Sequence, residues 1–247
     1  MKKIVGYTTF LVLLLSIMTM LSAKTTAPQP KEKTMKLYYV YDGLCGWCYG
    51  FSGIMTEFAE KHQEELDFEV IAGGMVTGER IGEIGIAAGY IGEAYKQVED
   101  HTGVKFGEAF LEGTLKEGTA LFTSVPSAIA LAVFKVQQPD KQIQFAARLL
   151  KSTYYDGNAP IDYVAYGKLA AEFGLDADDF VAKMETEEYE QLAEEQFKLA
   201  NDWGVTGFPT LVLEYQNNLI IMSGGYMPAP QLEQQFIAAK EELGVPK

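Results

Sequence analysis

The sequence contains few of the residues on which several common kinds of protein depend. Its 247 residues include two cysteines and two histidines, which is too few cysteine for a disulfide-stapled framework. His62 and His101 form no H-x-x-x-H pair that would complete a zinc site, so both are expected at the surface. Arginine occurs only at Arg80 and Arg148, which leaves no arginine cluster for phosphate. The net charge of −14 opposes binding to nucleic acid.

The N-terminal segment has the three parts of a secretory signal peptide. Met1-Lys2-Lys3 is positive, residues 4–21 are mostly apolar, and Ser22-Ala23 supplies small residues for cleavage. Residues 1–23 are therefore predicted to direct export, to the periplasm or beyond the cell. The alternative is an uncleaved membrane anchor over residues 4–23, which are long enough to approach a membrane span. Residues 24–35, which are rich in proline and lysine, are predicted to be a linker.

The first part of the remaining chain predicts a strand, a helix and a second strand. Residues 36–41 are aromatic and apolar and end at Asp42-Gly43, as a buried strand would. Apolar residues then follow at helical spacing up to His62, and residues 66–72 form the second strand. A right-handed crossover would make the two strands parallel.

The rest of the chain divides into a helical block and a closing unit. Residues 84–183 show mostly helical spacing and no strong strand signal. A long helix then runs from Thr186 to Gly204, followed by a hairpin of residues 210–215 and 219–222 and a last helix over 230–243. Without the helical block, the order of strands and helices is that of a thioredoxin fold that lacks its first strand. We therefore expect an α/β domain over 36–247, thioredoxin-like, with a helical insertion at about 79–184.

Both cysteines lie together, as Cys45-Gly46-Trp47-Cys48, at the predicted start of the first helix. Disulfide exchange needs a thiolate and a second thiol close enough to resolve the mixed disulfide. A helix start favours a negative sulfur, so Cys45 is predicted to attack, and Cys48, on the buried side, to resolve. A structural disulfide and a metal site are the alternatives. A structural disulfide would close a very short loop and so add little stability. A metal site would lack ligands.

Three motifs resemble the DsbA family of thiol-disulfide oxidoreductases, in its predicted protein-disulfide isomerase branch with a Cys-Gly-Trp-Cys motif. They are the stretch from Tyr41 to Gly50, the Gly73-Gly74-Met75 segment, and Gly204-Val-Thr-Gly-Phe-Pro-Thr210. The resemblance implies a thioredoxin domain interrupted by a helical insertion. It also implies a cis peptide bond before Pro209, with that proline opposite the cysteines.

The resemblance and the motif together suggest roles around the two cysteines. Gly46 and Trp47 should tune the reduction potential of the cysteine pair. Pro209 has no backbone N–H, so it cannot compete for a hydrogen bond to the sulfur. The loop before it and two nearby side chains should contact substrate; these residues are Thr206, Gly207, Phe208, Trp47 and Met75. Asp42 would oppose a thiolate if it points inward, and we expect a pair less oxidising than that of DsbA itself.

These features predict an enzyme that forms, reduces or isomerises disulfides in exported proteins, with the direction left open. Its partners would be unfolded or cysteine-containing exported polypeptides and a redox partner protein, with no metal or other cofactor and no nucleic acid. It would meet the membrane only if the signal segment stays uncleaved. Two alternatives remain. One is a chaperone-like module that binds peptides in the same groove. The other is a glutathione-dependent small-molecule isomerase of the kappa class, which typically carries serine where Cys45 stands.

Overall fold

The structure is a computed structural model, and it describes residues 35–246. The predicted signal peptide at 1–23 and almost all of the predicted linker at 24–35 lie outside the described residues. Within 35–246, no helix combines the length and the apolar character needed to cross a membrane.

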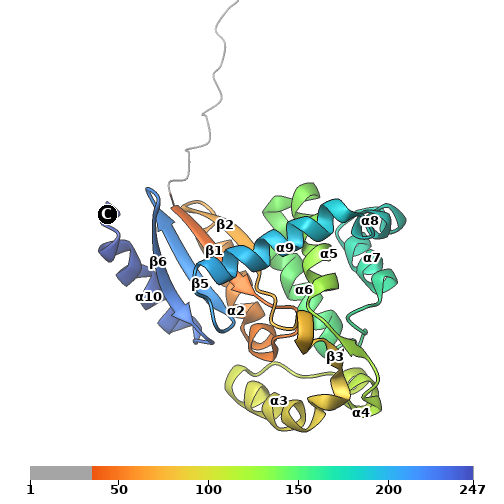
Figure 1. Cartoon of the computed structure of the whole chain (residues 1–247). Helices are drawn as coiled ribbons and strands as arrows, with labels where there is room; N and C mark the ends of the chain where they lie inside the picture. The colour runs from red at the N-terminus through yellow and green to blue at the C-terminus, as the bar shows by residue number, and fades with distance from the viewer. Residues whose placement is uncertain (1–34, 247) are drawn as a thin grey trace, which may run out of the picture. The chain divides into compact units, whose positions relative to one another are not determined.

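Four strands form the central sheet, in the order β2-β1-β5-β6 (Figure 1). They are β1 (Met35–Tyr41), β2 (Leu66–Ala72), β5 (Thr210–Tyr215) and β6 (Asn218–Gly224). β1 pairs parallel with β2 and antiparallel with β5, and β5 pairs antiparallel with β6. The parallel pairing of β1 and β2 confirms the prediction made from the strand–helix–strand order.

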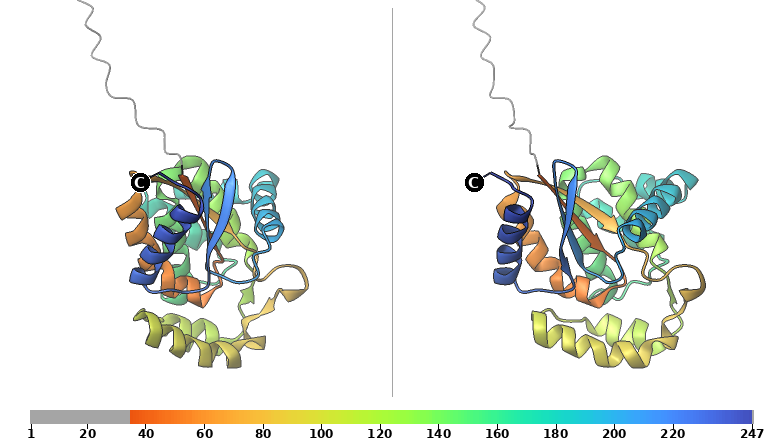
Figure 2. Two further views of the ribbon diagram at one scale, coloured as in Figure 1. Left: turned by 90° about the vertical axis from the view of Figure 1, so that its left-hand side faces the viewer. Right: turned by 60° about the vertical axis from the view of Figure 1, so that its left-hand side comes forward.

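Helices cover both faces of this sheet (Figure 2). α2 (Gly46–His62) and α10 (Ala229–Glu242) lie on one face, and α9 (Glu187–Asp202) lies on the other. Leu37 of β1 belongs to the larger core together with Met55 of α2, whereas Val40 packs with Ala200 of α9. Because β1 is buried on both faces, its sequence is a nearly continuous apolar run instead of an alternating one.

The chain between β2 and α9 forms a helical insertion (Figure 1). Its helices are α3 (Ala88–Thr102), α4 (Leu115–Glu117), α5 (Val125–Gln137), α6 (Gln142–Tyr154), α7 (Tyr163–Glu172) and α8 (Ala177–Met184). Short 3₁₀ turns occur at Gly78–Arg80, Ile84–Ile86 and Pro139–Lys141, and a π-helical turn occurs at Ala109–Thr114. Aromatic packing joins α5 to α6, where the stacked rings of Phe134 and Phe145 have centroids 3.9 Å apart.

Residues 84–183 show no strong strand signal in the sequence, yet the structure has one short strand there. β3 (Gly82–Glu83) pairs antiparallel with β4 (Leu121–Phe122), and β4 lies within that block. Two-residue strands are too short to show an alternation of apolar and polar residues. This small sheet joins the start of the insertion to the segment that precedes α5.

The outer edge of β2 is bonded by side chains from neighbouring helices. The Gln142 side chain accepts from the Val70 N–H at 2.7 Å and donates to the Phe68 carbonyl at 2.9 Å. Gln196 of α9 accepts from the Ala72 N–H at 3.0 Å. Buried backbone groups need such partners, so these glutamines fix the insertion and α9 to the sheet.

The hairpin between β5 and β6 forms where it was predicted, but its turn has two residues instead of the expected three, because β6 begins at Asn218. Both Gln216 and Asn217 have positive φ, at 50° and 64°. A two-residue turn with positive φ at both positions matches the twist of the strands that it joins. Asparagine adopts this conformation readily, whereas glutamine gives no such sequence signal.

Candidate active site

Cys45 is the N-cap residue of α2. The turn before it closes with a hydrogen bond from the Cys45 N–H to the Asp42 carbonyl at 3.0 Å. Its backbone is extended, and its sulfur accepts from the Cys48 N–H at 3.3 Å. An N-cap side chain normally uses an oxygen to satisfy a free helix N–H. Here a sulfur takes that position and accepts the helix N–H.

Cys48 lies one turn into the helix and is more deeply buried than Cys45. The exposed fraction is 0% for Cys48 and 6% for Cys45. Burial raises the pKa of the Cys48 thiol well above its usual range, and the adjacent Cys45 sulfur raises it further. Cys48 is therefore held as a neutral thiol.

The loop before β5 lies against the Cys45 sulfur, as the resemblance implies. The Phe208–Pro209 peptide bond is cis, and the Cys45 thiol donates to the Phe208 carbonyl at 3.4 Å. Thr206 and Gly207 are exposed at the start of this loop, and the Thr210 hydroxyl closes it by donating to the Gly207 carbonyl at 2.8 Å.

The predicted segment at Gly73 makes room for this loop. A Cβ built on Gly73 would lie 2.0 Å from the Phe208 ring, which is far inside contact distance. Only glycine fits there without moving Phe208, so the segment after β2 sets the place of the carbonyl that contacts Cys45.

Trp47 is half-buried beside the cysteines, where it bridges two distant parts of the chain. Its ring meets those of His101 and Tyr226, with centroids 5.8 Å away in each case. The Tyr226 hydroxyl in turn donates to the His101 carbonyl at 3.1 Å. Gly46 precedes it, and a Cβ there would make only ordinary contacts, the nearest at 3.7 Å from Phe106. Trp47 thus ties the helix start to the end of α3 and to the segment before α10.

Asp42 points inward, beneath the active-site turn. Its carboxylate accepts from the Leu44 N–H at 2.9 Å, the Ser124 hydroxyl at 2.8 Å and the Met75 N–H at 2.7 Å. Burial raises the pKa of this carboxyl, and the three donors partly offset that rise. The sequence suggested that Asp42 could oppose a thiolate, but it gave no sign of this network, because Ser124 lies 82 residues away.

An apolar cavity of about 210 Å³ adjoins Cys45. It is lined by Leu44, Cys45, Gly46, Trp47, Met75, Val76, Ala87, Tyr90, Ile91, Ala94, Tyr95, Val98, Phe106, Phe122 and Tyr154. Met75 and Trp47, both predicted to contact substrate, are therefore brought to one side of Cys45. Phe208 and its loop contact the sulfur without lining the cavity. The contribution of α3 was not predicted, because α3 lies far from the two cysteines in the sequence.

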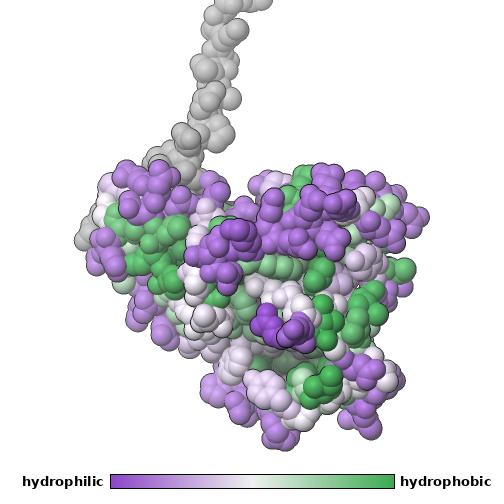
Figure 3. Space-filling model, viewed as in Figure 1, coloured by the Kyte–Doolittle hydropathy of each residue, from purple (hydrophilic) through white to green (hydrophobic). Residues whose placement is uncertain are grey.

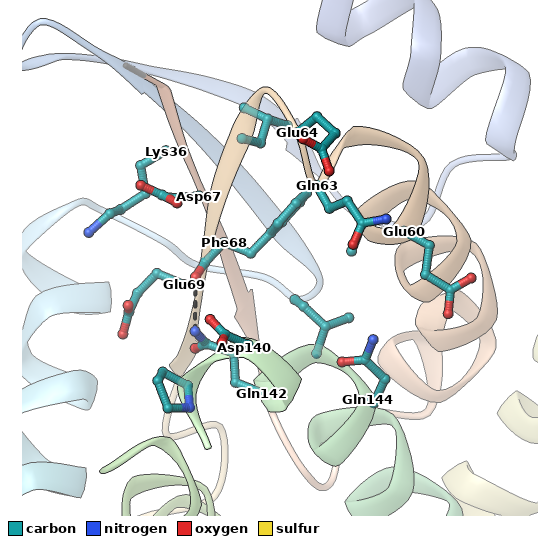
Figure 4. Close-up of a pocket in the computed structure, with 14 residues that line it drawn as sticks. Lys36, Glu60, Gln63, Glu64, Asp67, Phe68, Glu69, Asp140, Gln142 and Gln144 are labelled. Carbon is teal, nitrogen blue, oxygen red and sulfur yellow. Dashed lines mark hydrogen bonds between the residues drawn. The ribbon is translucent and has the colours of Figure 1, made fainter. Parts of the chain in front are cut away.

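A larger cavity lies elsewhere, along the outer edge of β2 (Figure 4). It measures about 640 Å³, and none of the predicted site residues lines it. Figure 4 shows mostly carboxylate and amide side chains around it, with Gln142 bonded to the Phe68 backbone. Of these side chains, Gln142 makes the contacts with the edge of β2 described above.

The two histidines differ in their surroundings. His101 is exposed, as predicted, whereas the prediction for His62 is wrong: it is 9% exposed at the end of α2. Its ring nitrogens lie 2.5 Å from Glu65 and 3.2 Å from Glu233 of α10. Glu233 lies far from His62 in the sequence, so this contact could not be predicted. Within residues 35–246, no group of three Cys, His, Asp or Glu side chains is placed to hold a metal ion.

Comparisons with solved structures find the same architecture. Cytosolic disulfide reductase DsbM from Pseudomonas aeruginosa is 26% identical, with a TM-score of 0.71 over 85% of this chain and 100% of that one. A candidate protein disulfide isomerase from Nitrosomonas europaea is 21% identical, with a TM-score of 0.72 over 85% and 99%. Oxidoreductase DsbA from Xylella fastidiosa is 12% identical, with a TM-score of 0.54 over 87% and 90%.

A search of curated proteins found no match. The family model of the DSBA-like thioredoxin domain matches residues 36–236, which is most of the chain. The thioredoxin-like α/β fold with a helical insertion is thus the fold of DsbA-like thiol-disulfide oxidoreductases. The chain belongs to the DSBA-like thioredoxin domain family.

Proposed function

We propose that the protein exchanges disulfides with exported, cysteine-containing polypeptides through Cys45 and Cys48. One observation carries this proposal: the Cys45 sulfur accepts a helix N–H at 3.3 Å and lies 3.4 Å from the carbonyl that precedes Pro209. The second thiol is one helical turn away and buried. This arrangement supplies a stabilised nucleophile, a place for a substrate backbone and a resolving thiol.

The reaction follows in two steps when the pair is reduced. The Cys45 thiolate attacks one sulfur of a client disulfide, so that a mixed disulfide forms and the other client sulfur leaves as a thiolate, which takes a proton. Cys48 then loses its proton and attacks the Cys45 sulfur, which releases the second client thiolate. The pair ends as a disulfide and the client has gained two electrons. The reverse sequence oxidises a client dithiol.

The loop at Pro209 would hold the client backbone beside the attacking sulfur. Phe208 presents its carbonyl and Pro209 has no N–H, so an extended segment can pair with this edge by strand addition. Thr206 and Gly207 are exposed where that segment would run. Trp47 and Met75 stand on the other side of Cys45.

We further propose that the pair is less oxidising than that of DsbA, so that it favours reduction or isomerisation. The carboxylate of Asp42 is buried beneath the turn that carries Cys45, and a buried negative charge destabilises a nearby thiolate. A less stable thiolate makes the reduced pair less favoured, which lowers its potential.

Export remains a proposal that rests on residues 1–23, whereas the DsbM neighbour is described as cytosolic. We propose the periplasm as the site of action, with residues 4–23 acting as an anchor if they are not cleaved. N-terminal sequencing of the protein recovered from the periplasmic fraction would test this. Recovery of the full-length chain in the cytosol would contradict it.

A glutathione-linked reductase is a second candidate, favoured by one specific observation. The DsbM structure has also been solved with glutathione, and that chain is 25% identical to this one. Glutathione would then be the reductant that regenerates the dithiol, with client polypeptides as the second substrate.

Three assays on the purified protein would separate these functions. Equilibration with glutathione gives the potential, and assays with reduced and with scrambled test proteins give oxidase and isomerase activity. We expect rescue of the scrambled protein and loss of activity in Cys45→Ala. Retention of activity in Cys45→Ala would indicate a chaperone-like holder, and oxidase activity without rescue would exclude isomerisation.

A further inference from the structure

We infer that the buried hydroxyl of Tyr39 assists the second step of the exchange, in which Cys48 attacks the mixed disulfide at Cys45. The hydroxyl would donate a hydrogen bond to the Cys48 sulfur once that sulfur has become a thiolate. This inference rests on the proposed function and names a further residue of the same reaction. Tyr39 lies on β1, an inner strand of the central sheet, and is 1% exposed.

The aromatic contacts of Tyr39 place it against the inner side of α2. Its ring packs edge-to-face with Phe51, which follows Cys48 by about one helical turn, and the ring centroids are 6.0 Å apart. Burial raises the pKa of Tyr39 well above its usual value, and the neighbouring Cys48 and Cys45 sulfurs raise it further. Tyr39 therefore keeps its proton and can act toward these sulfurs only as a donor.

The hydroxyl of Tyr39 is buried and has no hydrogen-bond partner among residues 35–246. Figure 3 shows hydrophilic side chains over much of one face of the protein, where water can supply partners. A buried hydroxyl without a partner costs stability, and a phenylalanine would fill the same place without that cost. A neutral thiol is a weak acceptor, so the reduced pair leaves this hydroxyl unsatisfied. A Cys48 thiolate would satisfy it.

The second step of the exchange is the one that needs such a donor. The Cys48 thiol must lose its proton before it can attack, and burial raises its pKa. A hydrogen bond given to the thiolate favours that form. The Cys48 sulfur then bonds to the Cys45 sulfur, the bond between Cys45 and the client breaks, and the lost proton passes through solvent to the client thiolate. Tyr39 keeps its own proton throughout.

Other groups around Cys48 act on the same proton. The Asp42 backbone N–H lowers the pKa of Cys48, whereas the charge of the Asp42 carboxylate raises it. Tyr41 and Tyr154 are buried and have raised pKa values, so both stay neutral. After burial, the pKa of Tyr41 responds most to Asp42, and Tyr154 already donates to the backbone of the active-site turn. Tyr39 is therefore the phenol placed to serve Cys48.

The first test measures the second step alone. Tyr39→Phe removes the hydroxyl and keeps the ring, and Tyr41→Phe is the matched control, because its hydroxyl is also buried without a partner among the described residues. Limiting methyl methanethiosulfonate at acid pH converts Cys45 to its methyl disulfide while Cys48 stays protonated. After a jump to neutral pH, acid quenching and intact mass analysis follow the release of methanethiol. We expect release about tenfold slower from Tyr39→Phe and unchanged from Tyr41→Phe.

The second test reads the ionisation of Cys48 directly. In Cys45→Ser protein labelled with ¹³C-cysteine, the Cβ chemical shift of the single cysteine follows its loss of a proton as pH rises. Adding Tyr39→Phe should move this transition to higher pH by about one unit, which is equivalent to the tenfold change in rate. Adding Tyr41→Phe should leave it in place. Chemical denaturation checks that the variants fold, and Tyr39→Phe should be at least as stable as the unaltered protein, since the hydroxyl that it removes has no partner.

The outcomes separate this inference from the proposed function. Equal rates of methanethiol release and equal titrations with and without the Tyr39 hydroxyl would overturn the inference and leave disulfide exchange intact. The inference would also fall if Tyr41→Phe caused the same losses, because the effect would then belong to any buried hydroxyl near the site. If the methyl disulfide of the unaltered protein released no methanethiol, Cys48 would not resolve it, and the proposed function would fall instead.

Discussion

The two cysteines differ sharply in environment although they belong to one short motif. Cys45 caps α2, receives a helix N–H, touches the Phe208 carbonyl and adjoins an apolar cavity. Cys48 is fully buried, and its thiol has a strongly raised pKa. Three residues in a helix turn the chain by nearly a full circle, so the two sulfurs lie on nearly the same side, with Cys48 one turn deeper in the protein. The position of Cys45 at the helix start and the burial of Cys48 support the proposal that Cys45 attacks and Cys48 resolves.

The largest effect is expected from removing either sulfur. Cys45→Ser should reduce turnover of a client disulfide to the uncatalysed rate, because Cys48 cannot reach solvent. Cys48→Ser should still attack once and then stall as a mixed disulfide. If Cys45→Ser turned over client disulfides as fast as the unaltered protein, the different roles assigned to the two cysteines would be contradicted. Gel electrophoresis without reductant detects the stalled species.

The surroundings of Cys45 can be disturbed without touching either cysteine. Gly73→Ala places a Cβ against the Phe208 ring, which should displace the carbonyl that faces the Cys45 sulfur. We expect the free energy of unfolding to fall by about 3 kcal/mol and the exchange rate to fall with it. Chemical denaturation and the client assay measure the two effects.

Gly53→Ala is the matched control for this change. Gly53 is exposed on α2, and a Cβ there meets nothing within 4 Å. In a helix interior this change should stabilise the protein by about 0.5–1 kcal/mol. Equal losses of activity in the two alanine variants would show that the placement of Phe208 does not matter.

Asp42→Asn sharpens the comparison by changing charge near both sulfurs. The asparagine cannot accept all three of the present hydrogen bonds, so we expect a loss of about 1.5 kcal/mol in stability. Removal of the buried charge should also make the pair more oxidising and shift the pH profile of exchange to lower pH. An unchanged potential in the glutathione equilibrium would show that Asp42 acts by structure alone.

The smallest effect concerns the far end of α2, where His62 meets Glu65 and Glu233. Burial works against the charged forms of both glutamates, but hydrogen bonds with His62 and with Lys240 or Lys61 outweigh it, so both pKa values are lowered. This contribution to stability is present above the unfolded pKa of about 4.3. It is lost as pH falls through the lower folded values.

Denaturation curves between neutral pH and pH 3 test this contribution. Because these side chains are partly exposed, the effect should stay below about 1 kcal/mol. Glu233→Gln should flatten the curve in acid, and exchange by Cys45 at neutral pH should not change. An identical acid dependence in Glu233→Gln would show that this contact adds nothing.

Local sequence signals predicted much of this molecule. The run before Asp42, the helical spacing up to His62 and the pattern around Asn217 placed β1, α2 and the hairpin where the structure has them. The position of Cys45 at a helix start followed from the same signals. Each depends on neighbours within a few residues, which a sequence displays directly.

Contacts across long separations could not be predicted in this way. The bond from Ser124 to Asp42, the burial of His62 by α10 and the cavity between α2 and α3 all join distant segments. The two-residue strands β3 and β4 have too few residues for a pattern. The environment of Cys45 therefore emerges only when the insertion packs against the sheet.

The most direct test of the central claim is alkylation of the reduced protein with limiting iodoacetamide at neutral pH, followed by peptide mass analysis. The same reaction after unfolding shows that both thiols can be labelled. The account predicts modification of Cys45 in the folded protein while Cys48 stays unmodified. Modification of Cys48 first, or of both at equal rates, would contradict the assignment of Cys45 as the attacking sulfur.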